Sequence, residues 1–192
     1  MAEKQLKIKH PHRYGLLFMV SKEDYNHLNK YKLKLDPYVK FYMKEECFND
    51  IAPQHISLCY FSYPEKYPKE VIKKLVPKIN RIAKKFIPMK IKVKGLLGGW
   101  ELGWGFPVIM WNIVDFGKIN EFHKKLITSL KKDVEHFNDV DLDFEPHIGI
   151  ALGNDEFLPK LKEIVENSKS DSEFELILDK LSIFFPEGIE EI

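Results

Sequence analysis

The chain has 192 residues, of which 44% are hydrophobic and 13% aromatic, enough to build the core of one ordinary domain. This composition excludes an intrinsically disordered chain and a small scaffold that depends on disulfides. The formal charge is only +1, from 30 basic and 29 acidic side chains, so the chain lacks the positive excess of a protein that wraps duplex nucleic acid. Any nucleic-acid partner should therefore be small or bound at one local site.

No segment predicts a membrane span or a secretion signal. Residues 1–15 contain no apolar run of signal-peptide length, and no stretch of 18 apolar residues occurs. The two cysteines, Cys47 and Cys59, are neither in a C-x-x-C pair nor at zinc-ligand spacing, which fits a reducing compartment without excluding a disulfide. We expect a soluble, cytoplasmic, monomeric protein with no membrane partner.

Charge is distributed unevenly along the chain. Residues 65–94 contain eleven basic and two acidic side chains, whereas residues 133–192 contain seventeen acidic and four basic ones. Such runs are usually solvated faces of helices. A basic surface could instead steer an anionic substrate toward its site, and the charge pattern alone does not choose between these interpretations.

The first half of the chain alternates predicted strands and helices. Runs of β-forming residues near prolines predict the strands, and apolar residues at helical spacing predict the helices. In chain order the elements are a strand at 14–20, a helix that starts at Lys22 behind the capping residue Ser21, an irregular segment at 35–53, a strand at 55–61 and a helix at 69–86. Pro77 lies inside this last helix and could kink it.

The second half begins with a predicted hairpin. Its elements are a strand at 89–97, a strand at 106–114, a helix at 119–137, a strand at 145–152, a helix at 156–167 and a last strand or pair of strands at 173–185. Glycines between the first two strands are typical of a turn. Antiparallel pairing at this hairpin favours an α+β fold over a parallel α/β sheet.

Two predicted strands in different halves repeat one local pattern. A histidine, an apolar residue, a small residue and another apolar residue occur at 55–58 (HISL) and again at 147–150 (HIGI), 92 positions apart and each near a proline. Successive side chains of a strand point to opposite faces. The expected aliphatic faces are Ile56, Leu58 and Tyr60 in the first strand and Ile148, Ile150 and Leu152 in the second. The expected opposite faces are His55, Ser57 and Cys59, and His147, Gly149 and Ala151.

Two histidines that face each other suit phosphodiester chemistry. A neutral imidazole can take a proton from an attacking hydroxyl or water, and a protonated one can give a proton to the leaving oxygen; with an ordinary pKa of about 6.5, both forms exist near neutral pH. Ser57 would lie on the face of His55 and could donate a hydrogen bond to a phosphoryl oxygen. This chemistry needs no metal or other cofactor.

The two motifs resemble those of the two-histidine (2H) phosphoesterases. That family includes bacterial 2′-5′ RNA ligase-like proteins, cyclic phosphodiesterases and the eukaryotic exonuclease that trims U6 RNA ends, and its mark is a pair of H-x-[ST]-x motifs. HISL at 55–58 matches fully, FEPHI at 144–148 is similar to the stretch around the second histidine, and the order of elements is similar over nearly the whole chain. Gly149 stands where the family has a second Ser or Thr. Loss of one transition-state donor can cost about 100 to 1,000-fold in rate, although a backbone N–H or a water could replace it.

Other interpretations of these residues remain open. Both histidines could be structural; the other five, His10, His12, His27, His123 and His136, are interpreted as surface residues. A zinc site is conceivable but lacks an H-E-x-x-H motif or a close ligand cluster. Ser57 as a covalent nucleophile lacks a G-x-S-x-G turn and an identifiable acid. Trp104, in the glycine-rich turn, is the best candidate to stack on a base; Tyr14 is a further candidate for substrate binding, and Trp111 is expected in the core.

The resemblance implies one bilobal domain over residues 1–192. It is expected to be α+β, with two pseudo-symmetric lobes of antiparallel sheet flanked by helices and with His55 and His147 opposed across the cleft between them. The implied function is a metal-independent phosphodiesterase that acts on RNA ends, 2′,3′-cyclic phosphates or short 2′-5′ or 3′-5′ oligonucleotides. Two alternatives are a nucleotide- or RNA-binding module weakened by Gly149, and a scaffold protein that uses its acidic carboxyl-terminal region.

Overall fold

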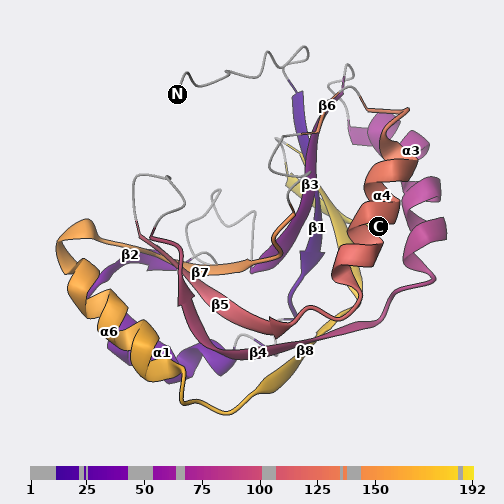
Figure 1. Cartoon of the computed structure of the whole chain (residues 1–192). Coiled ribbons are helices and arrows are strands. Elements are labelled where there is room, and N and C mark those ends of the chain that lie inside the picture. The colour runs from indigo at the N-terminus through magenta and orange to yellow at the C-terminus, as the bar shows by residue number, and fades with distance from the viewer. Residues whose placement is uncertain are drawn as a thin grey trace, which may run out of the picture.

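The structure, a computed structural model, is one curled sheet with helices on its outer side (Figure 1). It describes residues 12–21, 24, 26–42, 54–63, 68–100, 107–134, 136–137, 144–185 and 188–192. Within these residues the sheet has ten strands, and every pair of neighbouring strands is antiparallel. None of the helices in these residues is long and apolar enough to cross a membrane.

The first half of the sheet is covered by two helices. Its strands, in spatial order, are β10 (Gly188–Glu191), β9 (Lys180–Phe185), β1 (His12–Met19) and β3 (His55–Tyr63), with β6 (His136–Phe137) paired to β3. Helices α3 (Pro68–Ala83) and α4 (Ile119–Leu130) pack against each other and cover it. The ring of Phe122 in α4 lies 5.2 Å from that of Phe18 in β1. Aromatic packing therefore joins this helical layer to the sheet.

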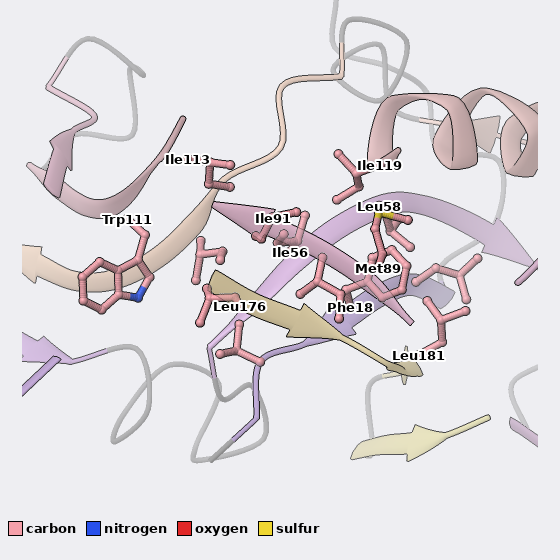
Figure 2. Close-up of a cluster of buried hydrophobic side chains, with 14 of the residues drawn as sticks. Phe18, Ile56, Leu58, Met89, Ile91, Trp111, Ile113, Ile119, Leu176 and Leu181 are labelled. Carbon is pink, nitrogen blue, oxygen red and sulfur yellow. The ribbon is translucent and has the colours of Figure 1, made fainter. Parts of the chain in front are cut away.

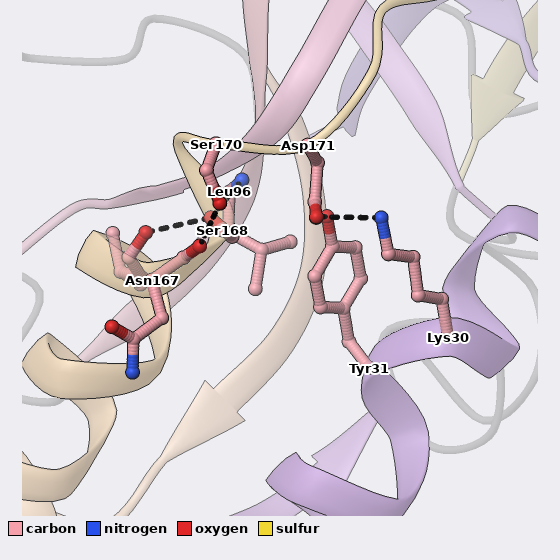
Figure 3. A network of polar contacts seen from close by, with 8 residues as sticks. Lys30, Tyr31, Leu96, Asn167, Ser168, Ser170 and Asp171 are labelled. Carbon is pink, nitrogen blue, oxygen red and sulfur yellow. Dashed lines mark hydrogen bonds and ion pairs between the residues drawn. The ribbon is translucent and has the colours of Figure 1, made fainter.

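The second half repeats this arrangement with two other helices. Its strands are β7 (Ile148–Gly153), β5 (Val108–Asp115), β4 (Met89–Gly98) and β8 (Phe174–Leu178), with β2 (Val39–Tyr42) paired to β7. Helix α1 (Asn26–Leu35) and helix α6 (Leu158–Ser168), which follows the 3-10 turn η2 (Asp155–Phe157), cover it. Tyr31 of α1 packs edge-on against Trp111 of β5, with ring centroids 5.8 Å apart. Its hydroxyl donates to Asp171, which also pairs with Lys30 at 2.6 Å (Figure 3), so α1 is tied to the chain that follows α6.

One continuous core joins the two halves. Strand β3 pairs with β7 where Ile56 lies opposite Ile148, and both isoleucines are fully buried. Figure 2 shows Phe18, Ile56 and Leu58 of the first half packed with Ile91, Trp111 and Leu176 of the second. The α+β class, the antiparallel strands and the flanking helices are confirmed, and the two predicted sheets are one sheet that passes through the β3–β7 contact.

Several element boundaries differ from those predicted. The helix expected at 119–137 ends at Leu130, and residues 136–137 form β6. Strand β2 lies within the segment expected to be irregular, and β10 was not predicted. Strands β6 and β2 pair with β3 and β7, which are remote in the chain, so local residue pattern gives little sign of them. Strand β10 pairs with β9, the strand just before it. Pro77 lies inside α3 without ending it, whereas the expected helix start at Lys22 falls outside the described residues.

Candidate active site

His55 begins β3 and His147 directly precedes the neighbouring strand β7, on the same face of the sheet. Because Ile56 and Ile148 are paired and point into the core, the residues beside them point to the opposite face. The antiparallel register places His55 opposite Gly149 and Ser57 opposite His147. We call the face of the sheet that carries these residues the site face.

The histidines are diagonal neighbours on this face. Directly opposite residues of an antiparallel pair have Cβ atoms about 4.5 to 5.5 Å apart, and diagonal neighbours lie about 7 to 8 Å apart. Both imidazoles are half-buried. This spacing lets both rings contact one small group held between them, with the Ser57 hydroxyl beside it.

A β-bulge follows each histidine at the same position. Leu16 of β1 pairs with Cys59 but Leu17 pairs with Ser57, so Leu58 is an extra residue in β3. Ile109 of β5 pairs with Ala151 and Met110 with Gly149, so Ile150 is an extra residue in β7. Each bulge lies three residues after its histidine, and beyond it the alternation of faces is inverted.

The bulges correct the predicted faces. Tyr60, expected on the aliphatic face, returns to the site face, and its hydroxyl lies 2.9 Å from Ser57 Oγ in a hydrogen bond. Leu152 likewise leaves the aliphatic face and joins Val108 and Met110 in a small cluster apart from the main core. Cys59 and Ala151, expected beside the histidines, are fully buried in the main core instead.

Gly15 makes room for Tyr60. The two residues are opposite each other in the β1–β3 ladder, and a Cβ at Gly15 would come within 2.8 Å of the tyrosine ring. The absence of a side chain at Gly15 therefore leaves the space that the Tyr60 ring occupies, and from there its hydroxyl reaches Ser57. The pair could not be predicted from the sequence because the bulge is not visible in the local pattern.

The hydrogen bond of His147 fixes the tautomer of its neutral ring. Nδ1 lies 3.0 Å from the backbone carbonyl oxygen of Glu145. A carbonyl only accepts hydrogen bonds, so Nδ1 carries a proton in this contact. In the neutral ring, Nε2 is then the nitrogen without a proton.

A third histidine supports both motif strands from behind. His123 of α4, expected at the surface, is only 4% exposed. It forms a hydrogen bond with the backbone of Leu58, the bulge residue of β3, and stacks on Phe144, three residues before His147, with ring centroids 3.9 Å apart. Its Nε2 is buried without a hydrogen-bond partner among the described residues. Burial, opposed by the Leu58 bond, lowers the pKa of His123 from 6.5 to about 4.

The remaining candidates divide between the core and undescribed parts of the chain. Tyr14 is fully buried and stacks on Phe61 at 5.8 Å; it shares the core face with Leu16, so it does not line the site and its assignment as a substrate contact was wrong. Trp111 is in the core as expected, and its Nε1 donates to Gln54 Oε1 at 3.1 Å. Trp104 lies outside the described residues. In the part of the chain that the structure describes, no three His, Cys, Asp or Glu side chains gather as a metal site.

Comparison with solved structures identifies the fold of this chain. No family model and no curated protein matches the sequence. Among solved structures, Kluyveromyces marxianus Usb1 superposes with a TM-score of 0.52 at 11% identity, over 93% of this chain and 96% of that one. TT0787 of Thermus thermophilus gives 0.52 at 14% identity, over 94% and 93% of the chains. Escherichia coli LigT complexed with 3′-AMP gives 0.52 at 11% identity, over 95% and 96%. The chain therefore has the fold of the two-histidine phosphoesterases.

Proposed function

We propose that this protein is a metal-independent phosphodiesterase that acts on RNA ends, 2′,3′-cyclic phosphates or short 2′-5′ or 3′-5′ oligonucleotides. The observation that supports the proposal most is the β3–β7 register, which brings His55, Ser57 and His147 together on one face of the sheet. In this proposal residues 1–192 act as one domain and as a monomer.

The proposed reaction is an acid-base displacement at phosphorus. One imidazole removes the proton from the attacking water or ribose hydroxyl as its oxygen bonds to phosphorus. The other imidazole gives a proton to the leaving oxygen as the bond between that oxygen and phosphorus breaks. The Ser57 hydroxyl donates to a non-bridging oxygen, where negative charge builds. Which histidine is the base depends on the side on which the leaving group lies.

Known complexes of proteins with this fold agree with a nucleotide ligand. Usb1 has been solved with uridine monophosphate, with a TM-score of 0.51 to this chain, and LigT with 3′-AMP. These ligands belong to those proteins, and they make nucleotides the first compounds to test here.

The proposal is tested by incubation with a panel of substrates in the presence of EDTA. The panel contains 2′,3′-cyclic nucleotides and short 2′-5′ and 3′-5′ oligoadenylates and oligouridylates, and mass spectrometry identifies the products. We expect one linkage class to be cleaved at an unchanged rate with and without EDTA. Cleavage that disappears in EDTA and returns with a divalent metal would contradict metal-independent catalysis.

The second candidate function is nucleotide or RNA binding without turnover. Gly149 lies opposite His55, so the position that faces this histidine offers no side-chain hydroxyl to a phosphate. The arrangement is thus unequal: Ser57 lies beside His147, and glycine beside His55. Heat of nucleotide binding in calorimetry, with no product across the panel, would favour this function over the enzyme.

The hydrogen-bonded pair of Ser57 and Tyr60 gives a prediction about the proposed phosphate donor. Ser57→Ala should lower kcat by about 100-fold, because one transition-state donor is lost. Tyr60→Phe removes the partner that orients Ser57 and should cost less, about 10-fold. The double variant should be no worse than Ser57→Ala, because both changes act through the same hydroxyl. Steady-state kinetics of the three variants check this, and fully multiplicative losses would show that Tyr60 acts independently of Ser57.

A further inference from the structure

A row of polar residues continues from the two histidine motifs across the second half of the sheet. Trp111 pairs with Ile148 and Met110 with Gly149, so the same register places Asn112 opposite His147. Val93 pairs with Ile113, which places Lys94 opposite Asn112. Both Lys94 and Asn112 are half-buried. The site face thus carries a row from Ser57 of β3 through His147, just before β7, and Asn112 of β5 to Lys94 of β4.

The position of Lys94 is fixed by contacts on its carboxyl-terminal side. Gly95 is the extra residue of a bulge in β4, because Leu96 pairs with Trp111 while Val93 pairs with Ile113, and its φ is +65°. A Cβ at Gly95 would come within 2.3 Å of the Ser168 carbonyl oxygen. The backbone N–H of Leu96 donates to Ser168 Oγ at 2.7 Å (Figure 3). Helix α6 therefore holds the bulge, and the bulge holds Lys94 on the site face.

The ammonium group of Lys94 is not neutralised by an ion pair with any residue that the structure describes. On the same strand, Lys90 pairs with Glu175 at 3.3 Å, and Lys92 lies opposite Asp115 and Glu175. The same register places Lys94 opposite Glu173, an exposed residue just before β8, but these two side chains form no ion pair. Lys180 is the counterpart of Lys94 in the first half of the sheet. It lies opposite Met19, which lies opposite His55, just as Lys94 lies opposite Asn112 next to His147. Lys180 pairs with Glu191 at 3.5 Å. The two ends of the site therefore differ in available positive charge.

An apolar strip runs beside this row. Met110 lies next to Gly149, and Leu97 lies opposite Met110 in β4. Leu97 is 45% exposed, although Leu96 before it is buried. Leu97 lies across Met110 from Gly149 and on the same strand as Lys94. It therefore offers a nucleoside an apolar surface next to a cation.

We propose that Lys94 and Asn112 bind a second phosphate of the substrate, one nucleotide away from the phosphate held by the histidines. The proposal rests on the proposed function and specifies its substrate as an oligonucleotide, or a nucleotide with two phosphates, rather than a mononucleoside cyclic phosphate. Neighbouring strands lie about 4.8 Å apart, so the backbone of Lys94 is about 10 Å from that of His147. The lysine side chain spans part of that distance, with the Asn112 amide in between as a neutral donor.

The test compares two ligands that contain no phosphodiester, so it is independent of turnover. These are 3′-AMP and adenosine 3′,5′-bisphosphate, whose two phosphates are one nucleoside apart, and calorimetry measures the dissociation constant of each. We expect the bisphosphate to bind about 10-fold more tightly than 3′-AMP, as one added charged hydrogen bond predicts. Lys94→Ala should remove that difference and leave the affinity for 3′-AMP within about twofold.

Lys180→Ala is the matched control, because it removes the corresponding lysine at the other end of the site. It should keep the preference for the bisphosphate. Equal binding of the two ligands by the unaltered protein, no binding of either one, or loss of the preference in Lys180→Ala alone would each overturn the proposal. If the preference for the bisphosphate depends on Lys94 but the protein cleaves no substrate of the panel, the second phosphate site stands and the proposed enzyme is rejected. If the protein cleaves a substrate but shows no preference for the bisphosphate, the enzyme stands and the second phosphate site is rejected.

Discussion

Alanine at either His55 or His147 should lower kcat of the cleavage reaction by about 1,000-fold while the protein stays folded. General acid or base catalysis by one side chain contributes about 100 to 10,000-fold, and each histidine is expected to perform one of these roles. Both side chains are half-buried on the site face, outside the cluster of residues that forms the main core. Their loss should therefore change the reaction far more than the free energy of unfolding.

Kinetics on the substrate found in the panel, together with urea unfolding of each variant, check this prediction. The unaltered protein should give a bell-shaped profile of kcat/KM against pH, because the proposed reaction needs one neutral and one protonated histidine. His27→Ala is the control, since His27 is an exposed residue of α1 that stacks on Phe174; its kcat should stay within about twofold. Full activity in either site variant would exclude catalysis by the two-histidine pair.

Acidification from pH 7.5 to 4 should destabilise the folded protein through His123. Its pKa is lowered from 6.5 to about 4 because its ring is buried, so the folded state holds the neutral form while the unfolded chain binds a proton below about pH 6.5. The resulting stability is complete above pH 6.5 and is lost as the pH falls from there toward 4. One pKa unit corresponds to 1.36 kcal/mol, so the loss from this residue approaches roughly 3 kcal/mol.

Urea unfolding at several pH values, on the unaltered protein and on His123→Gln, isolates this effect. Glutamine can donate to the Leu58 backbone but does not titrate, so the variant should be less stable at pH 7.5 and should lose less stability on acidification. Other carboxylates also titrate in this range, and the comparison removes their contribution because both proteins contain them. Identical slopes of stability against pH in the two proteins would show that His123 is not the group responsible.

The sequence predicted the main strands because their patterns are local, whereas it predicted the two histidines opposed across a cleft between two sheets rather than on paired segments of one sheet. A histidine, a small residue and β-forming neighbours bounded by proline identify β3 and β7, and alternation places His55, Ser57, His147 and Gly149 correctly relative to Ile56 and Ile148. Alternation could also have placed Tyr14 in the core, since it is two and four residues from Leu16 and Phe18, which are fully buried with it.

What the sequence could not predict depends on partners far along the chain. The bulges at Leu58 and Ile150 are defined by the strands opposite them, so simple alternation predicts the wrong face for Tyr60. The burial of His123 depends on Phe144 and Leu58, residues on other elements that only the folded sheet brings to α4. Lys94 is one of many basic residues in the sequence, and only the β4–β5 register places it beside Asn112.

The paired bulges make the two motif strands sensitive to the loss or gain of a single residue. Deletion of Leu58 would restore regular pairing with β1 and exchange the faces of all residues on one side of the deletion. Either His55 and Ser57 would turn into the core, or Tyr60 would leave its place over Gly15 while Cys59 emerged. Apolar substitutions at Leu58 and Ile150 should therefore be tolerated. Deletion of either residue would move the residues before it or after it off the face of the sheet that they occupy now.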